Sequence, residues 1–313
     1  MSARSAALRP AAAAAAAGPV WRGTDLARSA PLYWVLRVAC AFEFVGHGAF
    51  GLMTKAAWVP YFGVVGIPPE LAWTLMPLIG TVDISVGLIV ALRPMRALLL
   101  YMAFWGFLTA TIRPLAGEPV WEFLERAPNW AVPLAFLCLS GFGRSAKEWL
   151  SIASRGALTR TLSLWERERE GAGSRRLDWL LRIATAGALV GHGAFGAVMA
   201  KPAWFGYFAA AGLPPSAGLV SGVGLFEIAL GLLVLVRPIP ALLLFVVLWK
   251  LGTELLRPLA GEPLWEFVER WSSYTAPLAL LWVRGWPATA GEWLSGSGRG
   301  RPAGARAGRI LAP

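Results

Sequence analysis

The stretch RPLAGEPVWEFLER at residues 113–126 occurs a second time, as RPLAGEPLWEFVER at residues 257–270. The two copies differ only in the placement of valine and leucine. Each copy lies beside apolar runs of the length that crosses a bilayer, about 20 residues. A charged motif that recurs in this setting predicts an internal duplication of a membrane unit.

The first part of the motif has the residues of a turn between two helices. Pro114 has no backbone N–H, so we expect it to end the helix that closes at Arg113. Gly117 permits a tight turn, and Pro119 suits the first position of a new helix. The sequence therefore predicts a break between an apolar helix and a short second helix.

The second part of the motif has the pattern of a short helix with an internal ion pair. Glu122 and Arg126 stand four residues apart with the carboxylate first, the favourable order, and Glu266 and Arg270 repeat it. Trp121 gives the segment an apolar side, so we expect a helix in the membrane interface. The alternative is a loop that only anchors two spans.

Composition points to the same class of protein. Hydrophobic residues make up 57% of the 313 residues and charged residues only 15%, which predicts a polytopic membrane protein. The net charge of +11 comes mostly from the tails, the central linker and short turns, so it indicates topology and no nucleic-acid partner. Cys40 and Cys138 lie in apolar runs, and we expect structural thiols.

The apolar runs predict an all-α protein with eight transmembrane helices, as two parallel four-helix repeats with short interfacial helices. The first four spans are expected at about residues 33–53, 71–92, 97–112 and 130–142, and the last at about 273–283. The predicted domains are a disordered tail (1–30), a first repeat (31–143), a charged cytoplasmic linker whose WERERE segment forms a surface helix (144–176), a second repeat (177–284) and a disordered tail (285–313).

Basic residues predict the orientation. Both tails, the linker and the turns with Arg93, Arg96 and Arg237 lie on one side of the eight-span arrangement, which the positive-inside rule makes cytoplasmic. We therefore expect a multi-pass protein of a bacterial-type inner membrane with both termini in the cytoplasm. The two RPLAGEP segments then face outward, and the two repeats share one orientation about a pseudo-twofold axis along the membrane normal.

Polar residues inside the expected spans mark candidate functional positions. A charge at the centre of a span costs about 2.5–3.5 kcal/mol, so such residues must face protein or water. Glu43 and His47 share a helix face, so they could relay protons. His47 and His192, at equivalent positions, could meet as metal or haem ligands. A lone membrane histidine bonded to a neighbour is the commoner case, and we expect no metal.

The two copies differ in their charges. Glu43 aligns with Ala188, whereas Lys250 and Glu254 align with Gly106 and Ala110. Lys250 and Glu254 could simply pair with each other at four-residue spacing. The sharper hypothesis is that Lys250 also meets Glu227 or Glu43 in one asymmetric polar cavity, which gives one functional site per chain.

Four recurring elements together resemble the DoxX/DoxD-like membrane protein family, which is built on a four-helix membrane unit. They are an arginine in the first span, an HG pair followed by glycine and lysine, an aromatic loop that ends in GIPP or GLPP, and an acidic residue four positions before a glycine. In this sequence they fall at Arg37, His47 to Lys55, Ile67 to Pro69 and Asp83 to Gly87, and again at Arg182, His192 to Lys201, Leu213 to Pro215 and Glu227 to Gly231.

The resemblance implies a redox-associated role, since some members are subunits of a thiosulfate:quinone oxidoreductase. At most the chain would be a membrane subunit that binds a quinone or small anion near the outer face, with a periplasmic or membrane redox partner. The alternative is a non-catalytic scaffold or small-solute carrier. The expected proton-transfer residues are Glu43, His47 and His192; the expected binding residues are Lys55, Trp58, Tyr61, Asp83, Arg113 and Glu118, with Lys201, Glu227, Lys250, Glu254, Arg257 and Glu262 in the second copy.

Overall fold

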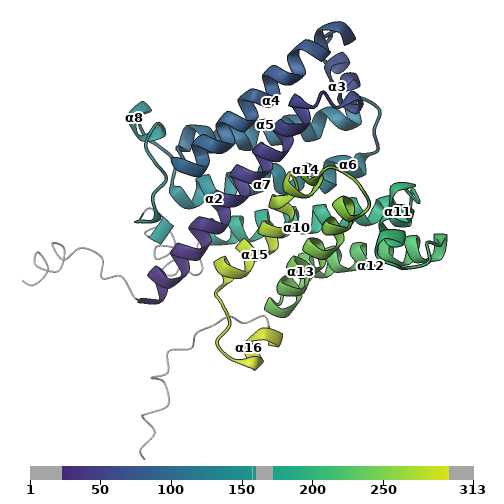
Figure 1. Ribbon diagram of the computed structural model, residues 1–313. Helices are drawn as coiled ribbons and strands as arrows, with labels where there is room; N and C mark the ends of the chain where they lie inside the picture. Colours follow the sequence, from purple (N-terminus) through teal and green to yellow (C-terminus); the bar gives the residue numbers. More distant parts are fainter. Residues whose placement is uncertain (1–22, 157, 160–171, 296–313) are drawn as a thin grey trace, which may run out of the picture.

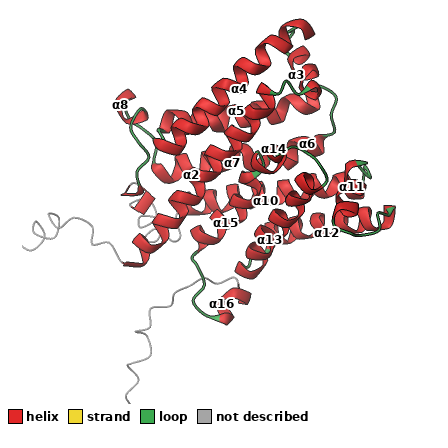
Figure 2. Ribbon diagram, in the orientation of Figure 1, coloured by secondary structure: helices red, strands yellow, loops and turns green. Residues whose placement is uncertain are grey.

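A computed structural model describes residues 23–156, 158–159 and 172–295. Every regular element in this part of the chain is a helix, and none is a strand (Figure 2), so the all-α prediction is confirmed. The WERERE segment and residues 1–22 and 296–313, on which predictions were also made, lie outside the described residues.

The two halves contain the same order of long and short helices. The first half comprises α2 (Gly23–Leu52), η1 (Ala56–Trp58), α3 (Val59–Val64), α4 (Pro69–Leu92), α5 (Arg96–Leu115), α6 (Val120–Glu125), α7 (Ala127–Ser140) and α8 (Ala146–Trp149). The second half comprises α10 (Ala172–Ala197), α11 (Ala203–Ala210), α12 (Ala217–Val236), α13 (Pro240–Leu259), α14 (Leu264–Val268), α15 (Trp271–Arg284) and α16 (Ala290–Ser295).

Five helices in the described residues are long and apolar enough to cross a membrane. They are α4, α5, α12 and the segments Ala30–Leu52 of α2 and Arg176–Ala197 of α10. Helices α7 and α15 have 14 residues each, or about 21 Å at 1.5 Å per residue, against a hydrocarbon core of about 30 Å. Helix α13 is long enough but carries three charged residues. Eight spans therefore stay a prediction.

Some predicted boundaries were wrong. Helix α5 continues through Pro114 to Leu115, because a proline in the last turn removes only one backbone hydrogen bond. The turn comes at Gly117, whose φ of +92° suits glycine, as predicted. A disordered tail was expected from residue 285, but α16 begins at Ala290. The N–H of Glu292 donates to the Thr289 hydroxyl, a capping pattern that the prediction overlooked.

Glycines bring the His-bearing helices against their neighbours. A Cβ atom added at Gly48 of α2 would lie 2.5 Å from the carbonyl oxygen of Gly80 in α4. The matching glycines of α10 and α12, Gly193 and Gly224, give the same 2.5 Å. These small residues let each pair of backbones touch.

The short helices of the motif pack on the opposite half of the molecule. Helices α6 and α7 contact α10, whereas α14 and α15 contact α2 (Figure 1). A Cβ at Gly46 of α2 would lie 2.4 Å from the backbone nitrogen of Glu269, and one at Gly191 of α10 would lie 2.3 Å from that of Glu125. Each half therefore holds the other through its copy of the motif.

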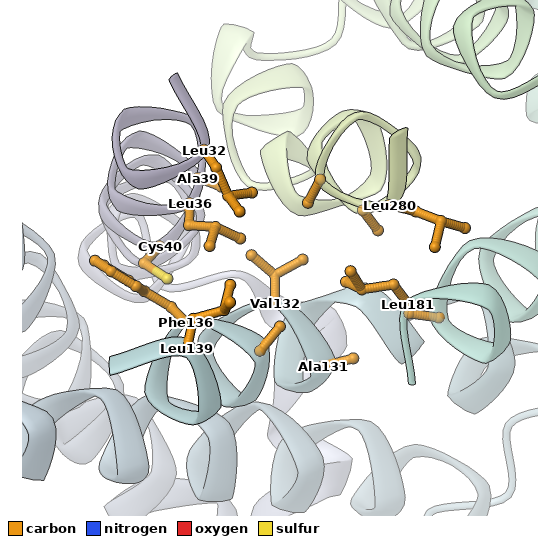
Figure 3. Packing of buried hydrophobic residues seen from close by; sticks show 14 of the residues in the cluster. Leu32, Leu36, Ala39, Cys40, Ala131, Val132, Phe136, Leu139, Leu181 and Leu280 are labelled. Atoms are coloured by element: carbon orange, nitrogen blue, oxygen red, sulfur yellow. The ribbon is translucent and has the colours of Figure 1, made fainter. Parts of the chain in front are cut away.

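This exchange builds one hydrophobic core from both halves. Leu36 of α2, Phe136 of α7, Leu181 of α10 and Leu280 of α15 are all fully buried and converge between the four helices (Figure 3). Because this cluster draws on both halves, the predicted first and second repeats share a core.

Candidate functional site

A histidine–carboxylate pair lies at the centre of the site in the first half. The Nδ1 atom of His47 in α2 lies 2.9 Å from Oδ2 of Asp83 in α4. The two side chains meet because the glycines described above bring α2 and α4 into backbone contact. The imidazole also stacks on Trp58, with ring centroids 4.5 Å apart. The pair is thus fixed both by a hydrogen bond and by an aromatic face.

An apolar cavity of about 210 Å³ opens beside this pair. Its wall comes from α2, η1, α3, α4 and α5, and most of its lining atoms are carbon. His47 and Arg113 are its ionisable lining residues, together with the Tyr61 hydroxyl. The remaining lining residues are Trp58, Phe62, Val65, Ile67, Met76, Ile79, Trp105, Leu108, Thr109 and Ile112. The cavity is therefore suited to a ring or chain with a polar group at one end.

The polar edge of the cavity is a three-residue cluster. Arg113 donates to the Tyr61 hydroxyl at 2.6 Å and lies 3.2 Å from Glu118, and Tyr61 donates to Glu118. Burial raises the pKa of the Tyr61 hydroxyl well above its usual value; the Arg113 charge opposes this shift and Glu118 adds to it. Tyr61 therefore stays protonated and remains a hydrogen-bond donor.

In the second half, the corresponding imidazole has a carboxylate on each side. The Nδ1 atom of His192 lies 2.5 Å from Oε2 of Glu227, and its Nε2 atom lies 3.6 Å from Oε1 of Glu254. Trp249 donates to the other oxygen of Glu227 at 2.8 Å. Beside this pair the hollow measures only about 20 Å³. Its aromatic side chains, among them Trp204, sit deeper than those of the first half.

In the first half, two corresponding atoms have no such partners. Oδ1 of Asp83 is buried and has no hydrogen-bond partner in the described part of the chain, because the shorter aspartate uses Oδ2 for both His47 and, at 3.4 Å, Trp105. Ala110 occupies the position that matches Glu254. Among the described residues no carboxylate lies within 4 Å of the His47 Nε2 atom. One acceptor and one imidazole nitrogen are therefore left for other partners.

A small polar pocket of about 30 Å³ lies on the other side of His47, between the halves. His47, Thr109 and Arg113 line both this pocket and the apolar cavity. The other lining residues are Glu125, Arg126, Asn129, Glu269, Arg270 and Ser273. A cavity of this size and polarity can hold a water molecule. His47 thus lies between an apolar cavity and a small polar pocket.

The predicted ion pair within the motif forms in both copies, and it belongs to a network that joins the halves. Arg126 lies 2.5 Å from Glu122, and Arg270 lies 2.6 Å from Glu266. The helices were expected to lie in the interface, but Glu122 and Glu266 are buried, because each helix docks on the opposite half.

Lys55 and Lys201 belong to this network and not to the cavity. Lys55 lies 2.7 Å from Glu266, and Lys201 lies 3.1 Å from Glu122, so each lysine binds the motif of the other half. Burial would raise the pKa of the Glu266 carboxyl, but Arg270 and Lys55 outweigh it and lower the pKa to about 2. These carboxylates are therefore charged at neutral pH and stabilise the contact between the halves.

Lys250 pairs within its own helix. Its ammonium nitrogen lies 2.6 Å from Glu254, the simpler of the two predicted arrangements. Glu254 also lies 2.6 Å from Arg257 and 3.4 Å from Arg270. Glu43 has a different partner, Ser272, so the predicted ion pair of Lys250 with Glu43 does not form. Like Arg113, Arg257 contacts its tyrosine and glutamate, Tyr207 at 2.9 Å and Glu262 at 3.3 Å.

One group of three side chains in the described residues has the spacing of metal ligands. Ligand atoms of Glu125, His192 and Glu254 lie within 4.8 Å of one another. Lys250 and Arg270 already supply positive charge at Glu254, so the donor set fits a lysine ammonium better than a metal ion. His47 and His192 each bond to the acid of their own half and line separate hollows, instead of forming the joint ligand pair considered above.

Three contributors were not singled out from the sequence. Trp105 and Thr109 line the first cavity, and Ser272 donates to Glu43. The first two recur as Trp249 and Thr253, and that recurrence was an available signal. No protein-family model, curated protein or solved structure matches the chain.

Proposed function

We propose that the first-half cavity binds the ring of a quinone, and that the chain is a membrane module of a redox system. The observation that carries this proposal is the contrast at the histidine–acid pair. An apolar cavity adjoins His47, and His47 contacts Asp83. Within the described part of the chain, the Nε2 atom of His47 has no carboxylate within 4 Å and the Oδ1 atom of Asp83 has no hydrogen-bond partner. A quinone needs an apolar slot with donors for its carbonyl oxygens; Arg113 has several N–H donors, and the imidazolium form of His47 donates from Nε2.

The size of the cavity supports a single ring. A protein cavity of about 150 Å³ can hold benzene, so about 210 Å³ has room for a substituted ring. The Trp58 face beside His47 suits stacking. A small anion fits less well, because the lining is apolar, Lys55 is bound to Glu266, and Arg113 is balanced by Glu118.

Reduction of a quinone to a quinol consumes two electrons and two protons. In this proposal a redox centre on a partner protein supplies the electrons, and His47 with Asp83 passes protons to the carbonyl oxygens. The resemblance to the DoxX/DoxD-like family agrees with such a role. We also propose the eight-span, parallel-repeat topology in a bacterial-type inner membrane with cytoplasmic termini, in which the cavity lies near the outer face.

A non-catalytic scaffold is the second candidate. The observation in its favour is that charged residues of the repeated motif form ion pairs between the halves, as in Lys55–Glu266 and Lys201–Glu122. In that case the cavity would be a packing defect that binds no polar ring.

A binding titration separates these functions. Quenching of tryptophan fluorescence by a decyl-substituted benzoquinone, in detergent, should give one site per chain. His47→Gln should weaken binding at least about tenfold, the effect of roughly one lost hydrogen bond, whereas the matched His192→Gln should not. No saturable binding, or equal losses in the two variants, would favour the scaffold.

A further inference from the structure

Glu43 is a buried acid whose surroundings leave its charge uncompensated. It is 3% exposed in α2, one helical turn before His47, and its Oε2 atom accepts a hydrogen bond from Ser272 of α15. Among the described residues no lysine or arginine lies within 4 Å of its carboxyl group. Asp83 of α4 and Glu269 at the end of α14 are close enough for their negative charges to act on it.

These surroundings favour the neutral acid. A buried carboxylate without a cation costs several kcal/mol, and two further negative charges add to that cost. A hydroxyl donor offsets only part of it. Glu43 is therefore expected to carry a proton at neutral pH, next to the His47–Asp83 pair.

The contact of Glu43 with Ser272 has no counterpart at the other histidine. Ala188 of α10 stands at the position that matches Glu43, and Pro128 of α7 at the position that matches Ser272, so the acceptor and the donor are both replaced there. Both partners of this contact thus differ between the halves.

The neighbouring groups offer a route for the proton. Oδ1 of Asp83 is a buried acceptor without a partner. Glu269, whose charge acts on Glu43, lines the polar pocket together with His47. Ser273, which follows Ser272 in the sequence, lines it too. A water molecule in that pocket could restore a proton that Glu43 had given up.

We propose that Glu43 is the proton reserve of the His47–Asp83 site. When the bound quinone takes up two electrons, the Glu43 O–H bond breaks and its proton passes through the pair to a carbonyl oxygen; the second proton comes from solvent through the polar pocket. Glu43 ends as a carboxylate and regains a proton from the same pocket. This inference rests on the proposed quinone site for the transfer, but not for the protonation of Glu43.

Infrared spectroscopy tests the protonation without any ligand. At pH 7 the protein should show a carboxylic-acid C=O band that Glu43→Gln removes and that Glu118→Gln, at the cavity edge, leaves in place. Ser272→Ala should move the band to higher frequency through the lost hydrogen bond. A wild-type protein without the band, or a band that survives in Glu43→Gln, would overturn the inference.

Stopped-flow reduction tests the transfer. Dithionite is mixed with protein that holds the decyl-substituted benzoquinone, and the first turnover is followed between pH 6 and pH 8. The wild-type rate should change little over this range. The rate of the Glu43→Gln variant should fall about tenfold from pH 6 to pH 8, because it depends on solvent protons; general acids typically contribute more than this. Identical pH profiles would overturn the transfer. A wild-type protein that binds no quinone would instead refute the proposed function, and the infrared result would stand.

Discussion

The two halves of the molecule build the same site from the same kinds of residues and finish it differently. Each has a histidine on an acid of the neighbouring helix, a tryptophan against the imidazole and an arginine–tyrosine–glutamate cluster. Beside one histidine lies a cavity of about 210 Å³, and beside the other a hollow of about 20 Å³. The same kinds of residues thus surround an open site in one half and a filled one in the other.

The charged surroundings of the two histidines differ in a few side chains. Glu254 approaches the free side of His192, and Lys250 and Arg257 balance its charge. The matching positions in the first half are Ala110, Gly106 and Arg113. The longer acid Glu227 satisfies Trp249 as well as the histidine. The comparison of the two histidines indicates that a buried polar atom becomes available to a ligand where the protein supplies no hydrogen-bond partner for it.

The largest expected effect is the loss of stability when the contact between the two halves is disturbed. Gly46→Ala and Gly191→Ala should each lower the free energy of unfolding by about 3 kcal/mol, because the new Cβ meets backbone of the opposite half at 2.4 and 2.3 Å. Thermal melting in detergent measures this. Gly252→Ala in α13, where nothing lies within 4 Å, is the control and should be neutral or stabilising. Similar melting of all three variants would mean that the motif helices do not dock across the halves.

Giving the first half the acid of the second should close its site. Ala110→Glu should place a carboxylate near the Nε2 atom of His47 and weaken quinone binding by about 2 kcal/mol, or roughly thirtyfold. The paired change Lys250→Met with Glu254→Gln in the second half should leave binding as it is. Fluorescence titration measures both. Undiminished binding in Ala110→Glu would show that the free nitrogen is not what the ligand uses.

Acid should loosen the contact between the halves. The pKa of Glu266 is lowered to about 2 in the folded protein from an unfolded value near 4.5, so its stabilisation is complete above about pH 5 and is lost as the pH falls toward 2. A loss on the order of 1 kcal/mol is expected between pH 5 and pH 3. Lys55→Met should reduce this loss more than Lys201→Met, whose ion pair is longer and more exposed. Melting curves at several pH values measure it, and equal slopes would contradict the assignment.

The smallest effect comes from one methylene group. Asp83→Glu should let the carboxylate serve both His47 and Trp105, as Glu227 does, and stabilise the protein by about 0.5 kcal/mol. Binding of the reduced, quinol form should weaken about threefold, because the unpaired acceptor for a quinol hydroxyl disappears. Calorimetry and titration give the two values. Tighter binding in this variant would show that the shorter acid is not what keeps the site open.

Local patterns predicted much of the fold. Four-residue spacing predicted the Glu122–Arg126 and Glu266–Arg270 pairs, and Gly117 predicted the turn after α5. These features depend on neighbours in sequence or on a single helix face. The exchange of motif helices was not predictable, because Lys55 and Glu266 are 211 residues apart and nothing local links them.

The sequence predicted His47, Trp58, Tyr61 and Arg113 as site residues, but not Trp105 or Thr109 and not which half is open. The histidine, the acid and the tryptophan in each half follow from recurring residues. Which half is open depends on side-chain length and on packing across the interface. Asp83 against Glu227 reads as a conservative difference in sequence, yet it decides whether a buried oxygen is paired.

A photolabelling experiment tests most directly whether only the first half holds a ligand. An azido-substituted benzoquinone would be activated in the purified protein and the labelled peptides located by mass spectrometry. We expect one label per chain, on lining residues such as Trp58, Ile79 or Leu108, and competition by unlabelled quinone. Equal labelling at Trp204, Val223 and Leu256 of the second half, or labelling without competition, would contradict the account.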